Sequence, residues 1–274
     1  MFQNIALVIH PDRSEARAFA LHAADWFAAR GIRCAELNAR TEGDFSTDLI
    51  LSFGGDGTFL IGARYAMALH VPLMGINFGT VGFLTEEEPE QLDSALEAIL
   101  NGRTYIEERS LLRAEDVRHG REHLALNDVV ITRGGYARLI RVECTVNGEQ
   151  YGVFTADGMI AATPTGSTGY SLSAGGPIVE PGMNCITLTP VCAHSLAQCP
   201  CIVSGSSRIS FRLQPDRRQT AELQIDGLNM GTLEAGDEIR VTGADEKIRL
   251  LRIRPYHFFS LLNQKLTEWG SRHD

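Results

Sequence analysis

The hydrophobic pattern of the chain changes near residue 104, and this change limits the folds that the chain can adopt. Before residue 104, apolar runs typical of strands alternate with segments whose apolar residues recur at helical spacing. After it, short strand-like runs follow one another with turn residues between them. Strands that alternate with helices form a parallel sheet with helices on its faces, whereas strands joined by tight turns form antiparallel sheets. The sequence therefore predicts an α/β domain followed by a mostly β domain.

The first part of the chain is expected to supply a parallel sheet and its helices. Strands are predicted at residues 5–9, 32–37, 49–53 and 71–76, and helices from about residue 12 to residue 30, at residues 58–69 and at residues 91–100. Asp12 and Glu15 have the spacing of a capping box at the start of the first helix, and Gly31 is a typical residue for its end.

The second part is expected to form antiparallel sheets. Asn147-Gly148 separates the predicted strands 142–146 and 150–154, and this dipeptide is the strongest short hairpin signal. Gly134-Gly135, Asp157-Gly158 and Asp226-Gly227 mark other bends. Another strand is predicted at residues 129–132.

The last segment, residues 255–269, carries apolar residues on one helical face and is predicted to be a helix that packs back on the first domain. The predicted α/β domain therefore comprises residues 1–103 together with 255–274, and the predicted β domain comprises residues 104–254.

The charge of the chain narrows the possible partners. The formal net charge is −9 and the sequence pI is about 5.4, whereas proteins that bind nucleic acid usually carry a basic surface. The sequence therefore predicts no nucleic acid partner. Only two of the 25 cationic side chains are lysines, Lys247 and Lys265. Phosphate chemistry in the first 246 residues would have to use backbone amides, arginine or a metal ion.

Six cysteines occur without regular spacing, and the single residue between Cys199 and Cys201 does not fit a zinc site. The chain begins with a strand-like segment instead of a secretory leader. We therefore expect free thiols and a cytoplasmic location. No apolar run reaches the length of about 18 residues that a membrane span needs, so no membrane partner is expected.

The first chemical signal is a glycine-rich turn between the predicted strand 49–53 and the following helix. Residues 54–58 read Gly-Gly-Asp-Gly-Thr. Glycines let a backbone approach a ligand, and consecutive amides before a helix suit a phosphate. The turn lacks the lysine of a Walker loop, and Leu60 stands where a dinucleotide fingerprint has its third glycine. The pattern indicates an anion site of another type.

Asp56 is an unusual residue for such a turn. A carboxylate beside a phosphate repels it unless the carboxylate binds Mg²⁺ or takes a proton from the attacking hydroxyl. The alternative interpretation is that Asp56 only caps the helix at Thr58.

Three further polar segments complete the candidate site. Residues 77–84 contain Gly79 and Gly82 and would lie beside the first turn, because the carboxyl ends of neighbouring parallel strands meet. Residues 163–173 carry six hydroxyl side chains and Tyr170, which suit ribose, amide groups and a stacked base. Asn127-Asp128 adds acceptors for sugar hydroxyls. An ordinary turn is the alternative for the first and third of these segments, and a solvated polar loop is the alternative for the second.

Taken in order, these motifs resemble those of NAD kinases. The resemblance rests on residues 54–58, 75–84, 126–128, 157–158 and 163–168, and it spans roughly residues 50 to 200. The glycine-rich turn alone is also similar to the turn of lipid kinases and phosphofructokinases. Asn127-Asp128 and the hydroxyl-rich loop favour the NAD kinases.

The resemblance implies a Rossmann-like α/β domain, similar to that of diacylglycerol kinases and phosphofructokinases, and an all-β sandwich domain, with the ligand between them. It implies transfer of the γ-phosphate of ATP to the 2′-hydroxyl of the adenosine ribose of NAD, which gives NADP, with Mg²⁺ held mainly by the ATP phosphates. It also implies a homotetramer or homodimer built through the β domain. A lipid or other small-molecule kinase and a non-catalytic nucleotide sensor remain alternatives.

The resemblance further implies roles for single residues. Asp56 would accept the proton of the 2′-hydroxyl. The ATP phosphate loop would consist of Gly54, Gly55, Gly57 and Thr58, with Gly57 also beside the NAD ribose. The remaining NAD contacts would be Asn127, Asp128, Arg138, Asp157, Thr168, Gly169, Tyr170, Ser171, Leu172 and Ser173.

Gly169 departs from the family pattern, because NAD kinases usually have alanine there. We expect this glycine to loosen the loop around Tyr170.

Overall fold

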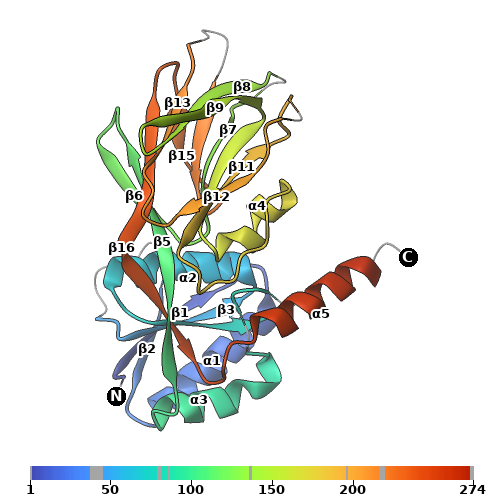
Figure 1. The fold of residues 1–274 in the computed structure, drawn as a ribbon. Coiled ribbons are helices and arrows are strands. Elements are labelled where there is room, and N and C mark those ends of the chain that lie inside the picture. Colours follow the sequence, from blue (N-terminus) through green and yellow to red (C-terminus); the bar gives the residue numbers. More distant parts are fainter. Residues whose placement is uncertain are drawn as a thin grey trace. The chain divides into compact units, whose positions relative to one another are not determined.

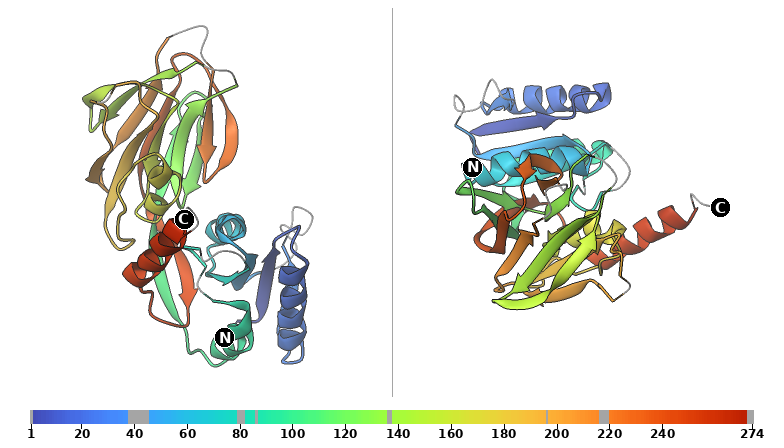
Figure 2. Two further views of the ribbon diagram at one scale, coloured as in Figure 1. Left: turned by 90° about the vertical axis from the view of Figure 1, so that its right-hand side faces the viewer. Right: turned by 90° about the horizontal axis from the view of Figure 1, so that it is seen from above.

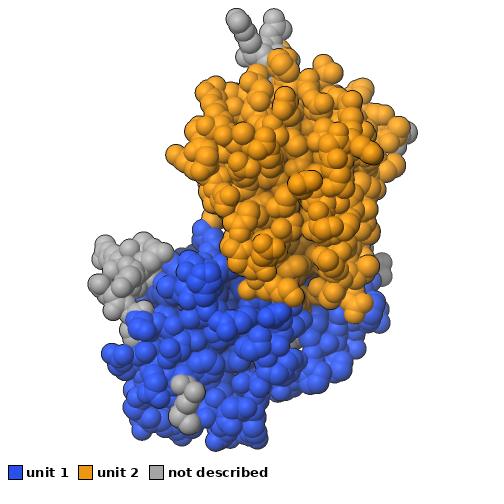
Figure 3. All heavy atoms as spheres, turned by 60° about the vertical axis from the view of Figure 1, so that its left-hand side comes forward, with its two compact units in different colours: residues 1–108, 248–274 blue, residues 109–247 orange. Residues whose placement is uncertain are grey.

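In the computed structural model, the chain forms two compact units (Figure 3). Unit 1 comprises residues 1–108 and 248–274, and unit 2 comprises residues 109–247. The structure describes residues 2–37, 46–78, 82–85, 87–135, 138–195, 197–215 and 220–271, with side chains up to residue 267.

A parallel sheet forms the centre of unit 1. Its strands are β1 (Asn4–Ile9), β2 (Arg33–Glu36), β3 (Leu49–Gly54) and β4 (Leu73–Asn77). They lie in the order β2-β1-β3-β4, and the C-terminal end of β16 (Glu238–Arg252) pairs with β4 in parallel through Leu250 and Leu73 (Figure 1). Strand β3 is buried at every position, as expected for a parallel sheet covered on both faces.

Helices cover both faces of this sheet. Helices α1 (Ser14–Ala28) and α3 (Leu92–Leu100) share a hydrophobic core with Leu49 and Leu51 of β3. Helix α2 (Asp56–Leu69) covers the other face, where Gly62 lies against the side chains of Ile50 and Ser52. The short 3-10 helix η1 (Pro89–Gln91) precedes α3, and α5 (Phe258–Ser271) follows β16. The alternation predicted for the first part of the chain is confirmed.

Two antiparallel sheets build unit 2 (Figure 2). One sheet has the order β12-β11-β10-β7-β14-β15. Its strands are β7 (Asp128–Arg133), β10 (Gly158–Ala162), β11 (Cys185–Val191), β12 (Cys201–Ser204), β14 (Ala221–Ile225) and β15 (Leu228–Leu233). Two short helices, η2 (Gly166–Thr168) and α4 (Tyr170–Ser173), follow β10.

The other sheet continues from β16 in the order β16-β13-β8-β9, and β5 pairs with both β16 and β6. Its remaining strands are β5 (Tyr105–Asp116), β6 (Arg121–Ala125), β8 (Ile140–Val146), β9 (Glu149–Ala156) and β13 (Ile209–Leu213). Strands β5 and β16 each run from one unit into the other.

A single hydrophobic core joins the two sheets of unit 2. Val129 and Ile131 of β7 contribute to the same buried cluster as Val142 of β8 and Phe211 of β13. The neighbouring residue Val130 points to the opposite face of its sheet, where it belongs to a smaller cluster. This alternation is the two-residue period of a strand with one face in a core.

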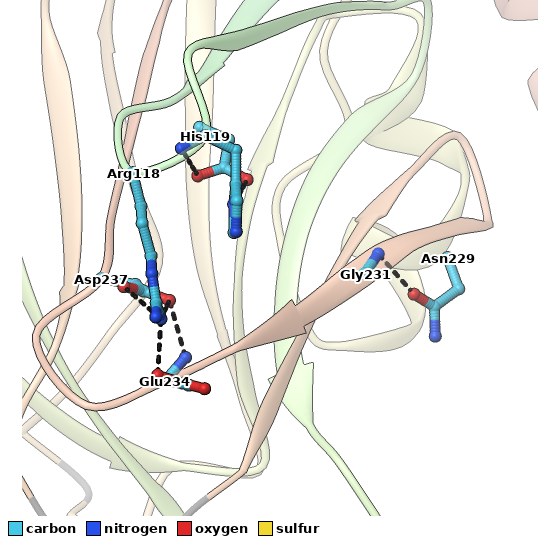
Figure 4. Close-up of polar contacts among 7 residues, drawn as sticks. Arg118, His119, Asn229, Gly231, Glu234 and Asp237 are labelled. Atoms are coloured by element: carbon cyan, nitrogen blue, oxygen red, sulfur yellow. Dashed lines mark hydrogen bonds and ion pairs between the residues drawn. The ribbon is translucent and has the colours of Figure 1, made fainter.

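Polar contacts join the turns at one end of unit 2 (Figure 4). Arg118, which follows β5, donates to Glu234 at 2.6 Å and lies 3.4 Å from the carboxylate of Asp237. The N–H of Glu234 donates to the same carboxylate at 2.7 Å. Asp237 therefore fixes the turn between β15 and β16 and links it to the turn after β5.

The hairpin turn predicted at Asn147-Gly148 is confirmed, and the bend predicted at Asp226-Gly227 is a hairpin turn of the same kind. Asn147 and Gly148 have φ angles of 53° and 84°, and Asp226 and Gly227 have φ angles of 47° and 79°. Left-handed backbone at both central residues is what a type I′ hairpin turn requires, and Asn-Gly and Asp-Gly supply it at low cost.

The predicted capping box at the first helix is wrong. Helix α1 starts at Ser14, and the N-cap residue Arg13 makes no side-chain capping bond. Asp12 instead belongs to the preceding turn, where its N–H donates to Nδ1 of His10 at 3.2 Å. The predicted end of the helix is confirmed, because Gly31 adopts a left-handed φ of 78°.

The six cysteines are free thiols, as expected. None of the helices in the described part of the chain combines the length and the apolar character that a membrane crossing demands.

Candidate active site

Asp56 is the first residue of α2, and its carboxylate points away from the helix cap. Gly55 is the N-cap residue, with an extended backbone and no side-chain capping bond. The interpretation of Asp56 as a helix cap is therefore wrong. Its Oδ2 accepts the N–H of Phe83 at 2.9 Å, and its Oδ1 accepts the N–H of Leu84 at 3.2 Å. Two peptide groups thus fix the orientation of the carboxylate, and each oxygen keeps a second lone pair.

The two glycine-rich segments are neighbours in unit 1, as the sequence predicts. Gly54 at the end of β3 pairs with Asn77 at the end of β4, and the N–H of Phe78 donates to the Gly54 carbonyl at 3.0 Å. Gly79 and the two residues after it lie outside the described residues. A Cβ at Gly82 would lie 2.0 Å from Oδ1 of Asp56, so this approach of the two segments requires glycine.

The residues expected to bind the ATP phosphates lie at the start of α2. No atom of the described residues would come within 4 Å of a Cβ at Gly55 or Gly57, so the backbone there is open to a ligand. Gly54 is closed instead, because a Cβ would lie 2.2 Å from Oγ1 of Thr58. The N-terminus of this 14-residue helix carries the unpaired N–H groups and the partial positive charge that attract phosphate.

The residues that support Phe83 and Leu84 were missed by the sequence reasoning. Tyr256 donates to the Phe83 carbonyl at 3.2 Å, and Arg252 donates to the Leu84 carbonyl at 3.3 Å. Lys265 is only 7% exposed, and its Nζ lies 5.3 Å from the centre of the Phe83 ring. All three belong to the C-terminal segment of unit 1, and no local pattern connects them with residue 83.

The oxygen atoms near Asp56 fit a magnesium ion that takes few ligands from the protein. Among the described residues, no group of three His, Cys, Asp or Glu side chains could hold a metal ion. Oγ1 of Thr85 is buried without a hydrogen-bond partner in the described structure, and it lies on the same side of Gly82 as Asp56. Carboxylate and hydroxyl oxygens suit Mg²⁺, which usually takes most of its other ligands from phosphates and water.

Asn127 and Asp128 lead into β7 in unit 2, and their side chains border Gly169. A Cβ at Gly169 would lie 3.7 Å from Nδ2 of Asn127 and 4.0 Å from Oδ2 of Asp128. Oδ1 of Asn127 is buried and has no hydrogen-bond partner among the described residues. A buried acceptor without a donor is rare in folded proteins, and a ligand hydroxyl would satisfy it.

Asp128 titrates in an unusual range. The side chain is only 5% exposed, and burial raises its pKa to about 7, with the negative charge of Asp226 as the second cause. In its protonated form the carboxyl group can donate a hydrogen bond as well as accept one.

The hydroxyls of the segment 163–173 divide into internal and accessible groups. Ser167 accepts the N–H of Val179 at 3.0 Å, and the Ser171 hydroxyl bonds with Thr189 at 2.8 Å. Thr168 donates to the carbonyl of Thr165 at 3.1 Å. These bonds hold the loop in shape, so the interpretation as a wholly solvated loop does not apply to Ser167 and Ser171, which are fully buried.

Tyr170, Leu172 and Ser173 are at least partly exposed, and Tyr170 keeps 43% of its surface open. Burial of its hydroxyl raises the pKa of Tyr170, and the nearby negative charges of Cys192, Asp157 and Asp128 add to this effect. Tyr170 therefore lies in the same region as two of the expected NAD contacts.

Asp157 and Arg138 differ in their surroundings. The carboxylate of Asp157 forms an ion pair with Arg133 at 2.7 Å. Arg138 is exposed.

Comparisons with known families cover most of the chain. Residues 34–104 match the ATP-NAD kinase N-terminal domain, and residues 126–253 match the ATP-NAD kinase C-terminal domain. The NAD kinase of Citrifermentans bemidjiense is 37% identical over 288 residues, which cover 98% of this chain and 100% of that protein. The NAD kinase of Syntrophotalea carbinolica is 43% identical over 228 residues, or 82% of this chain and 79% of its own.

Solved structures agree with these relatives. An NAD kinase from Archaeoglobus fulgidus in complex with ATP superimposes with a TM-score of 0.76 and 26% identity, and covers 96% of this chain and 98% of its own. Yeast NADH kinase complexed with NADH has a TM-score of 0.84 over 97% of this chain and 88% of its own, and at 24% identity it supports the fold alone. By sequence along nearly its whole length, the chain belongs to the NAD kinase family.

Proposed function

We propose that this chain transfers the γ-phosphate of ATP to the 2′-hydroxyl of the adenosine ribose of NAD and thereby forms NADP. Membership of the NAD kinase family over almost the full chain supports this activity. The observation that carries the chemical part is the carboxylate of Asp56, which two peptide N–H groups orient beside an open glycine backbone at a helix N-terminus.

Asp56 is the proposed proton acceptor. A sugar hydroxyl does not ionise near neutral pH, so a carboxylate helps only by taking the proton while the new bond to phosphorus forms. The N–H groups of Phe83 and Leu84 keep the carboxylate in one orientation, which lowers the cost of reaching the reactive geometry.

The ATP phosphates are proposed to bind at Gly54, Gly55, Gly57 and Thr58. Phosphoryl transfer depends mainly on positioning and on stabilisation of charge, which backbone amides and a helix N-terminus supply. Mg²⁺ is the proposed cofactor; it would be held mainly by the ATP phosphates and would supply positive charge to them. These residues then hold the phosphate chain without a lysine.

NAD is the proposed ligand of the polar cluster in unit 2. Asn127 and Asp128 would bind its hydroxyl groups, as the free acceptor on Asn127 suggests. Asp157, Arg138 and Thr168 are proposed as further contacts, together with Gly169, Tyr170, Ser171, Leu172 and Ser173. The hydroxyls of the half-buried Thr168 and the buried Ser171 already have protein partners, so their contribution would come through the backbone that they hold.

Three other properties remain proposals. The α/β unit is proposed to be Rossmann-like, of the type found in diacylglycerol kinases and phosphofructokinases, with a C-terminal helix packed back on it and a β sandwich as the second domain. The sequence-based domain bounds, 1–103 with 255–274 and 104–254, are proposed alongside the two compact units. The assembly is proposed to be a cytoplasmic homotetramer or homodimer formed through the β domain, which sedimentation measurements test.

A coupled assay tests the activity. The purified chain is incubated with NAD, ATP and Mg²⁺, and NADP formation is followed with an NADP-specific dehydrogenase. The expected result is NADP formation that needs all three components. A chain that binds NAD and ATP without turnover would be a sensor, and one that phosphorylates only a lipid or another alcohol would be a kinase of the related type.

A further inference from the structure

The carboxylate of Asp226 lies at the centre of a hydrogen-bond cluster in unit 2. It accepts the backbone N–H groups of three consecutive residues: Leu126 at 2.8 Å, Asn127 at 2.7 Å and Asp128 at 3.1 Å. The N–H of Asp226 donates in return to the carbonyl oxygen of Asp128 at 3.1 Å. Because Asp226 is only 8% exposed, water competes little for these bonds. The buried carboxylate of Asp226 therefore holds the backbone N–H groups of residues 126–128.

Thr163 fixes the carbonyl side of the same segment. Its hydroxyl donates to the carbonyl of Leu126 at 2.6 Å, and its N–H donates to the carbonyl of Asn127 at 2.8 Å. Gly166 lies directly against this backbone, since a Cβ there would be 2.0 Å from the Asn127 carbonyl oxygen. The side chains of Asn127 and Asp128 therefore project from a backbone that is held on both sides.

The hairpin turn at residues 226–227 does not itself require a carboxylate. Asn147-Gly148 forms a turn of the same kind in the same unit, with similar φ angles. There an amide is sufficient, because Oδ1 of Asn147 accepts the N–H of Arg208 at 2.9 Å. At residue 226 both side-chain oxygens face N–H donors, and only a carboxylate has acceptors on both. The need for Asp226 therefore comes from the segment 126–128.

We propose that Asp226 is a positioning residue for dinucleotide binding, whose carboxylate holds Asn127 and Asp128 in the orientation that receives the ribose hydroxyls. This inference rests on the proposed function for the identity of the ligand. It adds a residue that contacts no ligand itself and acts through the backbone of residues 126–128.

Asp226 also acts on Asp128 through its charge. Burial is the main reason why the pKa of Asp128 is raised, and the negative charge of Asp226 is the second. Tyr170 of α4 also lies within electrostatic range of Asp128, with Asp157 and Cys192 near it. Removal of the charge at residue 226 therefore lowers the pKa of Asp128 towards its ordinary value.

The substitution Asp226→Asn tests the positioning role. Asparagine is also favoured in this type of turn. Its NH₂ group, however, would face a peptide N–H, and two donors cannot form a hydrogen bond with each other. We expect KM for NAD to rise about tenfold, or about 1.4 kcal/mol, while KM for ATP and kcat change by less than about twofold. The pH at which KM for NAD changes should also move to lower values, because Asp128 titrates earlier. An equal rise in both KM values, or an unchanged pH profile, would contradict the proposal.

The matched control is Asn147→Asp, the reverse exchange in the second hairpin turn of the same type. It changes the charge by one unit, with the opposite sign, at a residue that the proposed binding site does not use. We expect both KM values and the pH profile to stay as in the wild type. A rise in KM for NAD, or a shift of the pH profile of similar size in the opposite direction, would mean that any change of charge in unit 2 has an effect.

Hydrogen exchange of the wild type tests the same idea without a variant, in case Asp226→Asn fails to fold. The amides of Leu126, Asn127 and Asp128 should exchange slowly before NAD is added, because the carboxylate already holds them. Protection that appears only after NAD is added would overturn the proposal.

Calorimetric titration with NAD separates this inference from the proposed function. A wild-type chain that binds NAD but forms no NADP contradicts the proposed activity alone. A wild type and an Asp226→Asn variant that bind NAD with equal affinity contradict the positioning role alone.

Discussion

Three aspartates of this protein have different roles because their hydrogen-bond partners and their burial differ. Asp56 accepts two peptide N–H groups near a segment of open glycine backbone, and it remains partly exposed. Asp226 accepts three and is buried. Asp128 lies beside Asp226 without a cation to compensate its charge in the described part of the chain. The first carboxylate is suited to proton transfer, the second to holding backbone, and the third to a change of protonation near neutral pH.

The substitution Asp56→Asn tests the proposed proton acceptor. The amide keeps the shape of the side chain but cannot take a proton, so kcat should fall by roughly 10²- to 10⁴-fold. Steady-state kinetics with NAD and ATP measure the change, and Asp25→Asn on the exposed side of α1 serves as the control. A variant at residue 56 with near-normal turnover would refute the assigned role.

Asp128 makes stability depend on pH. Because its pKa is raised to about 7 in the folded chain, the folded state binds more protons than the unfolded state between about pH 4 and pH 7. The contribution of Asp128 to the free energy of unfolding is therefore complete below about pH 4 and is lost as the pH rises through 7. The slope is at most about 1.4 kcal/mol per pH unit.

Urea unfolding at several pH values measures this effect. The free energy of unfolding of the wild type minus that of Asp128→Asn should fall as the pH rises from 5 to 8. A difference that is constant over this range would show that Asp128 has an ordinary pKa.

At the scale of secondary-structure elements, features that leave a local sequence pattern could be predicted, whereas features that depend on long-range contacts could not. Strand β3 and both Asn/Asp-Gly hairpins could be predicted, because burial and turn geometry leave marks on neighbouring residues. Helix α2 begins at Asp56, two residues before the predicted start, because Gly55 takes the cap position with backbone alone. A cap without a side chain leaves no signal in the sequence.

The same distinction between local motifs and long-range contacts applies to the candidate site. The glycine-rich turn, Asn127-Asp128 and the hydroxyl-rich loop are local motifs, and the sequence reasoning identified them. The contact of Asp56 with Phe83 joins residues 27 positions apart, and that of Asp226 with Leu126 joins residues 100 apart. Such contacts depend on how elements pack, which periodicity and turn signals do not encode.

Gly82 in the second glycine-rich segment should affect turnover, because it leaves room for the carboxylate of Asp56 in the first segment. In Gly82→Ala the new methyl group would meet Oδ1 of Asp56 at 2.0 Å and push the carboxylate aside. Because the carboxylate itself remains, we expect kcat to fall by about 100-fold, as for a catalytic group displaced by about 1 Å. Circular dichroism and steady-state kinetics separate loss of activity from loss of fold.

Gly182→Ala is the matched control, since a Cβ there would meet no atom of the described part of the chain within 4 Å. It should leave kcat unchanged. Equal kinetics for Gly82→Ala and the wild type would mean that the position of Asp56 in the free enzyme does not matter for turnover.

On the scale of the whole molecule, the cysteines differ in reactivity because they differ in burial. Cys192 and Cys199 are exposed, whereas burial raises the pKa of Cys34 to about 11 and that of Cys144 to about 12. Thiolate is the reactive form, so the buried thiols should react slowly near neutral pH.

A thiol titration with an aromatic disulfide reagent at pH 8 measures this. The denatured chain should yield all six thiols, and the native chain should show a fast phase from Cys192 and Cys199. The double variant Cys192→Ser with Cys199→Ser should lose the fast phase and keep the slow one. Fewer than six thiols in denaturant without reductant would reveal a disulfide in the purified protein.

Strand β16 has a consequence for how related chains can vary. Val241 near its start belongs to the core of unit 2, and Leu251 near its end belongs to the core of unit 1. A deletion of one residue between them would invert the inward and outward side chains of one core or the other, because a strand repeats every two residues. Insertions and deletions among homologues should therefore occur in turns and not in this strand. The strand should then have the same length in distant members, which makes it a reliable reference for aligning their sequences.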